Sequence, residues 1–144
     1  MARAFQLAGL LRLRQIEKDH AASDLAAANA FRRDAGERQA RAIAALHAVP
    51  VEATDASTLF AMAAARASSR SMLADLAALA ERADADVAEA QTAFGEAKAR
   101  AVGLEKLEAR HNASVIAGEL SAEQAAIDEI ATGAWVRERE GNDA

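Results

Sequence analysis

Three histidines, His20, His47 and His111, are the first residues of this sequence that could bind a metal ion. No two of them stand three or four residues apart, and none is followed by an acidic residue as in the zinc proteases. Histidines on one helix bind a metal together only at such spacing, because only residues three or four apart share a face. We therefore expect no metal site, and we expect His111 to be a polar residue within an apolar row.

Carboxylates gather at two places, which are Asp84, Asp86 and Glu89, and then Asp128 and Glu129. General acid or base chemistry needs a carboxyl group whose pKa is shifted by burial or by a close charge. Nothing in the surrounding sequence would bury these groups, so we expect both clusters to be solvated helix faces.

Other chemical motifs are absent or uninformative. Asn112, Ala113 and Ser114 match a glycosylation motif, which matters only in a secreted protein, and residues 1–13 do not read as a signal peptide. No glycine-rich loop that could cradle phosphate is present, and the chain has no cysteine. We predict a protein that is not an enzyme and binds no cofactor.

The composition predicts long helices rather than a thick core. Of the 144 residues 52% are hydrophobic but only 3% are aromatic, and much of the apolar content is alanine. Alanine is the strongest helix former and fills little space, so such a chain buries narrow seams between helices. The length fits a single domain.

The charge disfavours nucleic acid as a partner. The formal net charge is −5, with a net of +3 in residues 1–47 and −8 in residues 48–144, so the two arms of the chain attract each other weakly. No apolar run approaches the roughly 18 residues of a transmembrane segment. We expect a cytoplasmic protein that is at most peripheral to the membrane.

A repeat of 3.5 residues runs from Leu59 to Val115 and predicts one long helix with a seam that needs a partner. Thirteen of its seventeen positions are apolar, and the row reads Leu59, Met62, Arg66, Ser69, Leu73, Leu76, Ala80, Ala83, Val87, Ala90, Phe94, Ala97, Ala101, Leu104, Glu108, His111 and Val115. A second row with eight apolar positions of twelve runs from Leu7 to Leu46, off which Phe31 lies.

These rows predict an all-α fold in which two long helices form an antiparallel coiled-coil hairpin with a longer second helix. We expect helix one over about 3–47, a loop over about 48–55, helix two over about 56–135 and a frayed tail over 136–144. Pro50 ends the first helix because it lacks an amide hydrogen, and Asp55 is a good N-cap for the second.

Symmetric pairing about the loop places Arg3 beside Lys98 to Arg100 and leaves the residues after Val102 without an intrachain partner. Gly95, Gly103 and Gly118 are candidate bend points in that part of helix two. The overhang could also fold back on helix one or pair with a second copy, so these alternatives stay open.

Apolar residues left without a partner on a helix favour a protein interface. Trp135 is either a helix-end packing contact or an anchor for a partner. The residues that we expect at such an interface lie in the first turns of helix one and in the overhang: Phe5, Leu7, Leu10, Leu13, Ile16, Leu104, Leu107, Arg110, Val115, Leu120, Ile127, Ile130 and Trp135.

Several stretches resemble the flagellar FliJ family, especially its alanine-rich actinobacterial members. They are the opening Phe5 to Glu17, the run Gly103-Leu104-Glu105-Lys106-Leu107-Glu108-Ala109-Arg110-His111 and the later Glu119 to Ala131. The resemblance covers about Phe5 to Ala131. It implies a cytoplasmic component of flagellar type III export, located at the flagellar base.

The resemblance also implies the partners, which are the hexameric export ATPase, the cytoplasmic domain of the membrane export gate and export chaperones. Members of the family are similar to the central stalk of rotary ATPases. We expect the helix ends to enter the ATPase ring, and the loop end and outer faces to contact the gate. The rival interpretation is a structural coiled-coil spacer that self-associates as a homodimer.

Overall fold

The computed structural model describes residues 4–142 and contains two helices, α1 over Ala8–His47 and α2 over Ala56–Asn142. No strand occurs among these residues. The chain divides into two compact units. We call residues 15–99 the hairpin unit and residues 1–14 with 100–144 the terminal unit.

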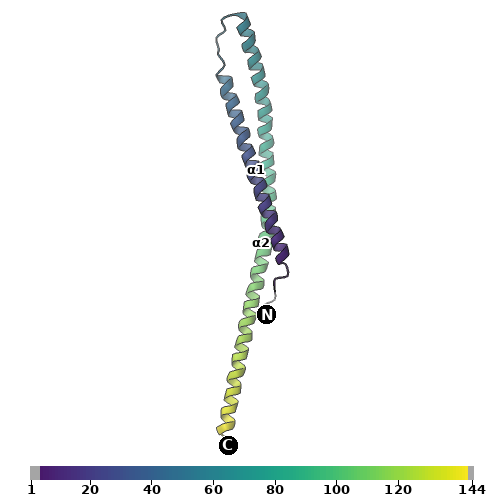
Figure 1. Ribbon diagram of the computed structural model, residues 1–144, viewed down its shortest axis with the longest axis vertical. Coiled ribbons are helices and arrows are strands. Elements are labelled where there is room, and N and C mark those ends of the chain that lie inside the picture. The colour runs from purple at the N-terminus through teal and green to yellow at the C-terminus, as the bar shows by residue number, and fades with distance from the viewer. Residues whose placement is uncertain (1–3, 143–144) are drawn as a thin grey trace. The chain divides into compact units, whose positions relative to one another are not determined.

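In the hairpin unit α1 and the first half of α2 lie side by side and run in opposite directions (Figure 1). The side chains of Arg32 and Asp84 meet across the pair, with 4.0 Å between guanidinium and carboxylate. The expected fold class, two antiparallel helices of which the second is longer, is confirmed.

Small residues form the centre of the pairing. Ala35 and Ala83 have no exposed surface, and Val87 and Ala97 are 3% exposed. The 3.5-residue rows thus predict the buried positions correctly in this part of the chain. Because alanine methyl groups hold the helices together, their axes lie close and the buried layer is thin.

The register of the hairpin differs from the symmetric pairing. Symmetry about the loop would place Arg32 opposite residue 70, whereas it meets Asp84, a shift of about 14 residues or four turns. Figure 1 shows the cause, because residues 48–55 are drawn out alongside the first turns of α2. Eight extended residues span up to about 26 Å, while four helical turns need only about 22 Å.

This shift leaves the first turns of α2 without a helix opposite them. Leu59, the first position of the predicted row, is 58% exposed, and Phe60 is 75% exposed. Val51 in the loop is 82% exposed. The loop end of the hairpin unit therefore presents apolar side chains to solvent.

The connection between the helices follows local chemistry. α1 ends at His47, three residues before Pro50, as the missing amide hydrogen requires. The backbone N–H of Thr58 donates to the Asp55 carboxylate at 2.6 Å, so Asp55 is the N-cap of α2 as expected. The hydrogen bond to the Thr58 backbone lowers the pKa of Asp55 below its ordinary value of 3.8.

The Asp55 cap predicts a pH-dependent contribution to stability. Since the folded pKa is lowered, the contribution is fully present above the ordinary value and is lost as the pH falls through the lowered one. We expect Asp55→Asn to keep the cap and lose this acid-dependent part. Carbon-detected NMR titration of Asp55 should give a midpoint below 3.8; a midpoint at or above 3.8 would show that the cap does not form in solution.

The start of α1 and the end of α2 differ from the expected bounds. α1 begins at Ala8 rather than near residue 3, and Arg3 lies outside the described residues. α2 continues through the expected tail to Asn142, and residues 143–144 also lie outside the description. α2 passes Gly95, Gly103 and Gly118 without interruption, because an isolated glycine costs only about 1 kcal/mol in a helix.

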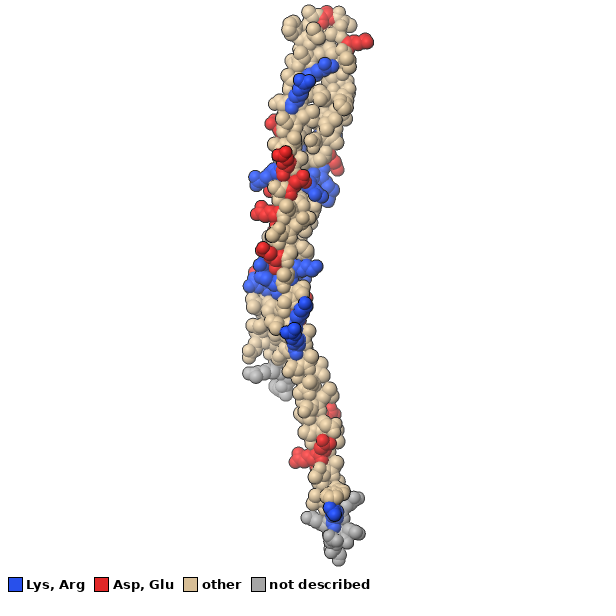
Figure 2. All heavy atoms as spheres, turned by 180° about the vertical axis from the view of Figure 1, so that it is seen from behind, with Lys and Arg blue, Asp and Glu red and all other residues tan. Residues whose placement is uncertain are grey.

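Charged side chains of both signs stand in small groups along the helices (Figure 2). On the face drawn in Figure 2, Lys and Arg alternate with Asp and Glu along the helices and no large patch of one sign forms. Binding to nucleic acid relies on a continuous basic surface, which this face lacks. Within residues 4–142 neither helix contains a segment long and apolar enough to cross a membrane.

Candidate interaction surface

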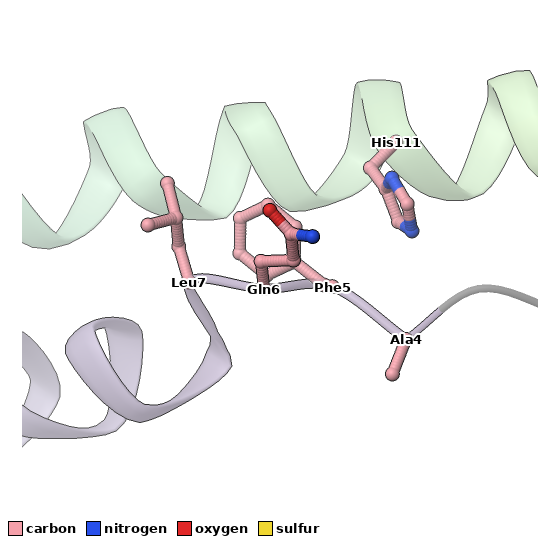
Figure 3. A pocket seen from close by; sticks show the side chains of 5 residues that line it. All are labelled: Ala4, Phe5, Gln6, Leu7 and His111. Carbon is pink, nitrogen blue, oxygen red and sulfur yellow. The ribbon is translucent and has the colours of Figure 1, made fainter.

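The terminal unit is organised by a short N-terminal segment that lies on α2. Ala4 and Phe5 are extended, Gln6 and Leu7 form a turn, and the backbone N–H of Ala8 donates to the Phe5 carbonyl at 3.2 Å. Figure 3 shows Phe5 and Leu7 pointing toward α2 and His111 pointing from α2 toward the segment. The Phe5 and His111 rings are 5.6 Å apart at an angle of 42°.

The hollow between this segment and α2 is small. It has a volume of about 320 Å³ and is lined by Ala4, Phe5, Gln6, Leu7 and His111. His111 is half-buried within the seam row, as predicted from the sequence. An aromatic pair of this kind contributes about 0.5–1.5 kcal/mol beyond the area that it buries.

The covered part of α2 reaches beyond the predicted limit. Ala101 is fully buried, and half-buried positions continue through Leu104, Glu108 and His111 to Val115. The expectation that α2 is uncovered from about Val102 is therefore wrong. That limit came from the symmetric pairing, and the contact of Phe5 with His111 has the same shift of about 14 residues as the contact of Arg32 with Asp84.

Replacing Phe5 tests this contact. We expect Phe5→Ala to remove the ring-current shift on the His111 ring protons and to leave helix content unchanged, since Phe5 lies outside both helices. Gln6→Ala is the matched control because Gln6 is an exposed neighbour in the same segment and contributes no ring to the Phe5–His111 pair. NMR spectra of the histidines measure the effect, and an unchanged His111 resonance in Phe5→Ala would refute the contact.

Beyond Val115 every described side chain of α2 is exposed except at Gly133, which is half-buried. This exposed segment carries large apolar residues, which are Ile116 (57% exposed), Leu120 (61%), Ile127 (53%), Ile130 (69%), Trp135 (56%) and Val136 (42%). The Arg139 guanidinium lies over the Trp135 ring, 4.4 Å from its centre. Trp135 thus contacts its own helix and remains open on one side.

Four of the six large apolar residues of the exposed segment fall on one face, and Trp135 and Val136 lie off it. Ile116, Leu120, Ile127 and Ile130 follow steps of four and three residues, a row completed by Glu123 and Ala134. At about 100° per residue the four large side chains lie within about 80° of one another. We call this face the C-terminal stripe. It has coiled-coil spacing over nearly three heptads and lies about 100° around α2 from the covered row that ends at Val115.

Residues 116–136 of the exposed segment carry charge of one sign, and Arg137 and Arg139 follow them. Residues 116–136 contain four acidic residues, Glu119, Glu123, Asp128 and Glu129, and no Lys or Arg. Glu119 borders the C-terminal stripe and Glu123 stands within it. The segment therefore combines an apolar face with a negative charge of four.

The other chemical candidates form no reactive site. His20 pairs with Asp24 at 3.0 Å, Arg82 pairs with Asp86 at 2.9 Å, and all four are exposed or half-exposed. Hydrogen bonding to Asp86 raises the pKa of Arg82, which keeps it charged. Across residues 4–142 no group of three His, Cys, Asp or Glu side chains could hold a metal ion.

The expected interface residues are distributed over both units. Phe5, Leu104 and Val115 are half-buried within the terminal unit. The others are exposed, and they are Leu7, Leu10, Leu13, Leu107, Arg110, Leu120, Ile127, Ile130 and Trp135 in the terminal unit and Ile16 in the hairpin unit. The structure brings Phe5 and Leu7 together and places Leu120, Ile127 and Ile130 on one stripe.

The exposed loop end with Val51 and Phe60 was not expected from the sequence, because the symmetric pairing placed a helix beside it. Ile116 lies in the overhang that was expected to have no intrachain partner, and it belongs to the C-terminal stripe. The steps of four and three from Ile116 to Ala134 start one residue after the first row ends.

A family model described as "Flagellar FliJ protein" matches residues 3–140, nearly the whole chain. The chain belongs to the flagellar FliJ family. Comparison with curated proteins and with solved structures gave no match. Membership in the FliJ family indicates a component of flagellar protein export, as the sequence resemblance implied. The matched residues of this FliJ chain include the N-terminal segment, the hairpin unit and α2 as far as residue 140.

Proposed function

We propose that this FliJ-family chain is a non-catalytic, stalk-like component that engages the export ATPase ring through its terminal unit. The observation that carries the proposal is the exposed length of α2 after Val115, which bears five large apolar side chains among residues 116–135. Apolar residues in such number on a solvated helix support a protein partner. Membership in a flagellar export family supports the export ATPase as that partner.

The proposed ATPase-binding residues are those of the terminal unit and the adjoining turn of α1. They are Phe5, Leu7, Leu10, Leu13, Ile16, Leu104, Leu107, Arg110, Val115, Leu120, Ile127, Ile130 and Trp135. The members that are more than half exposed would lose most water on binding, so we expect them to contribute most; they are Ile16, Leu120, Ile127, Ile130 and Trp135.

The loop end of the hairpin unit is the proposed contact for the cytoplasmic domain of the export gate. Val51, Leu59 and Phe60 are each more than half exposed there, which supports a second protein surface. The outer faces of the same unit would contribute to the gate contact, and export chaperones are the third proposed partner. We propose that the chain acts in the cytoplasm, peripheral to the membrane at the base of the flagellum.

Mixing the purified chain with the export ATPase tests the proposal. We expect a chain that is monomeric by sedimentation, binds the ATPase and raises its rate of ATP hydrolysis. The alternative, a structural coiled-coil spacer, predicts a tight dimer at all protein concentrations and no effect on the ATPase. Absence of ATPase binding by the full chain would refute the proposed function.

A further inference from the structure

The C-terminal stripe has the geometry of a coiled-coil seam that lacks its second helix. Ile116, Leu120, Ile127 and Ile130 are each more than half exposed, while the covered row on the same helix ends at Val115. From Ile116 to Ala134 the stripe is about 27 Å long. A partner helix of three heptads would match this length and bury its apolar positions between knobs and holes.

We propose that the C-terminal stripe binds a basic amphipathic helix of a partner protein. This inference rests on the proposed function, which locates a binding surface for a partner protein in the terminal unit. It adds the chemistry of the partner, which neither the family nor the fold specifies. Two features lead to it, namely the position of Glu123 within the stripe and the acidic charge of residues 116–136.

Glu123 stands in the middle of the stripe, between Leu120 and Ile127. A purely apolar partner helix would cover this carboxylate without pairing it, at a cost that outweighs much of the apolar gain. A Lys or Arg on the partner at the same layer removes that cost and fixes the register of the two helices. Glu119, at the edge of the stripe, offers a second position for a basic residue.

The charge of residues 116–136 selects among the ligands that could cover an apolar helix face. Four carboxylates without a Lys or Arg repel an anionic membrane surface and repel nucleic acid. A second copy of the chain would bring the same four carboxylates to the contact, which disfavours self-pairing. A basic helix is attracted by the same charges, so its association would be fast and would weaken with salt.

A designed peptide tests the proposal with the full-length protein. The probe is a synthetic 28-residue helix with Ile and Leu at the seam positions and Lys at the flanking ones. Its matched control carries Glu in place of every Lys. We expect calorimetric titration to show binding of the Lys peptide that weakens at least tenfold from 50 to 300 mM salt, and no binding of the Glu peptide.

Two charge-reversal variants locate the site. Glu123→Lys is expected to weaken binding of the Lys peptide by about tenfold or more, because it places a cation in the contact. Glu129→Lys is the control, since it makes the same charge change about 140° away from the centre of the stripe, and we expect at most about a threefold effect. Circular dichroism checks that both variants remain helical, which their exposure at this part of α2 favours.

The outcomes separate this inference from the proposed function. Equal binding of the two peptides, equal effects of the two variants, or a chain that dimerises until Glu123 is reversed would each overturn the basic-helix assignment. If the Lys peptide binds but the export ATPase does not, the surface chemistry stands and the proposed function fails. If the ATPase binds and the Glu123→Lys variant binds it equally well, the ATPase uses another surface and the inference fails.

Discussion

A chain truncated after Val115 should lose association with the export ATPase and keep its hairpin. The removed residues 116–144 contain the C-terminal stripe, whose side chains make no buried contact with the rest of the described chain. Burying a side chain such as Ile127 or Leu120 in an interface contributes about 1.5–3 kcal/mol, so loss of the whole stripe should weaken binding by several orders of magnitude. Pull-down and the rate of ATP hydrolysis measure the loss.

The truncation has a simple internal control. The hairpin unit ends at residue 99, so its thermal midpoint should stay within about 2 °C of the full chain, as expected when only exposed residues leave. A truncated chain that melts normally and binds the ATPase with unchanged affinity would show that docking uses the hairpin unit instead. A truncation after Val136 removes the last turns alone and should keep most of the binding.

The second large effect is expected in the alanine seam. Ala83 has no exposed surface, so the larger side chain of Ala83→Leu has no space and must push α1 away from α2. Overpacking of this kind costs about 1–3 kcal/mol, and a thin seam offers few neighbours that can adjust. Chemical denaturation of the full chain measures the loss.

Ala85→Leu is the matched control for the seam. Ala85 lies two residues away on the exposed side of α2, where a leucine meets solvent and keeps good helix propensity. We expect a change below about 0.5 kcal/mol there. If Ala83→Leu and Ala85→Leu were equally stable, the helices of the hairpin unit would not be in the close contact described.

The helices themselves were predictable because their causes are local. The 3.5-residue row identified the buried face of α2 from Leu73 to Val115, Pro50 ended α1 and Asp55 capped α2. Each of these effects acts within a few residues of the chain. A single sequence is therefore sufficient to show them.

The register of the hairpin was not predictable in the same way. It depends on how far eight loop residues extend, and the same number of residues spans very different distances in a compact turn and in an extended segment. The error of about four turns in the symmetric pairing comes from this single quantity. It also concealed the exposed loop end.

The start of α1 was missed for a related reason. Phe5 lies outside α1 and packs its ring on His111, a residue more than a hundred positions away in the sequence. The composition of residues 3–8 is compatible with a helix, so propensity alone placed the boundary too early. The exposure of the C-terminal stripe was predictable from its apolar residues, because it does not depend on the register of the hairpin.

Trp135 gives this chain a natural optical label. It is the single tryptophan, and the sequence contains no tyrosine, so nearly all absorbance and emission in the near ultraviolet come from one indole. That indole is more than half exposed and lies on the part of α2 without an intrachain partner, about one and a half turns from Ile130. Its emission will therefore report the binding of a partner near the C-terminal end of α2. Unfolding of the alanine seam in the hairpin unit will not change the environment of this indole directly.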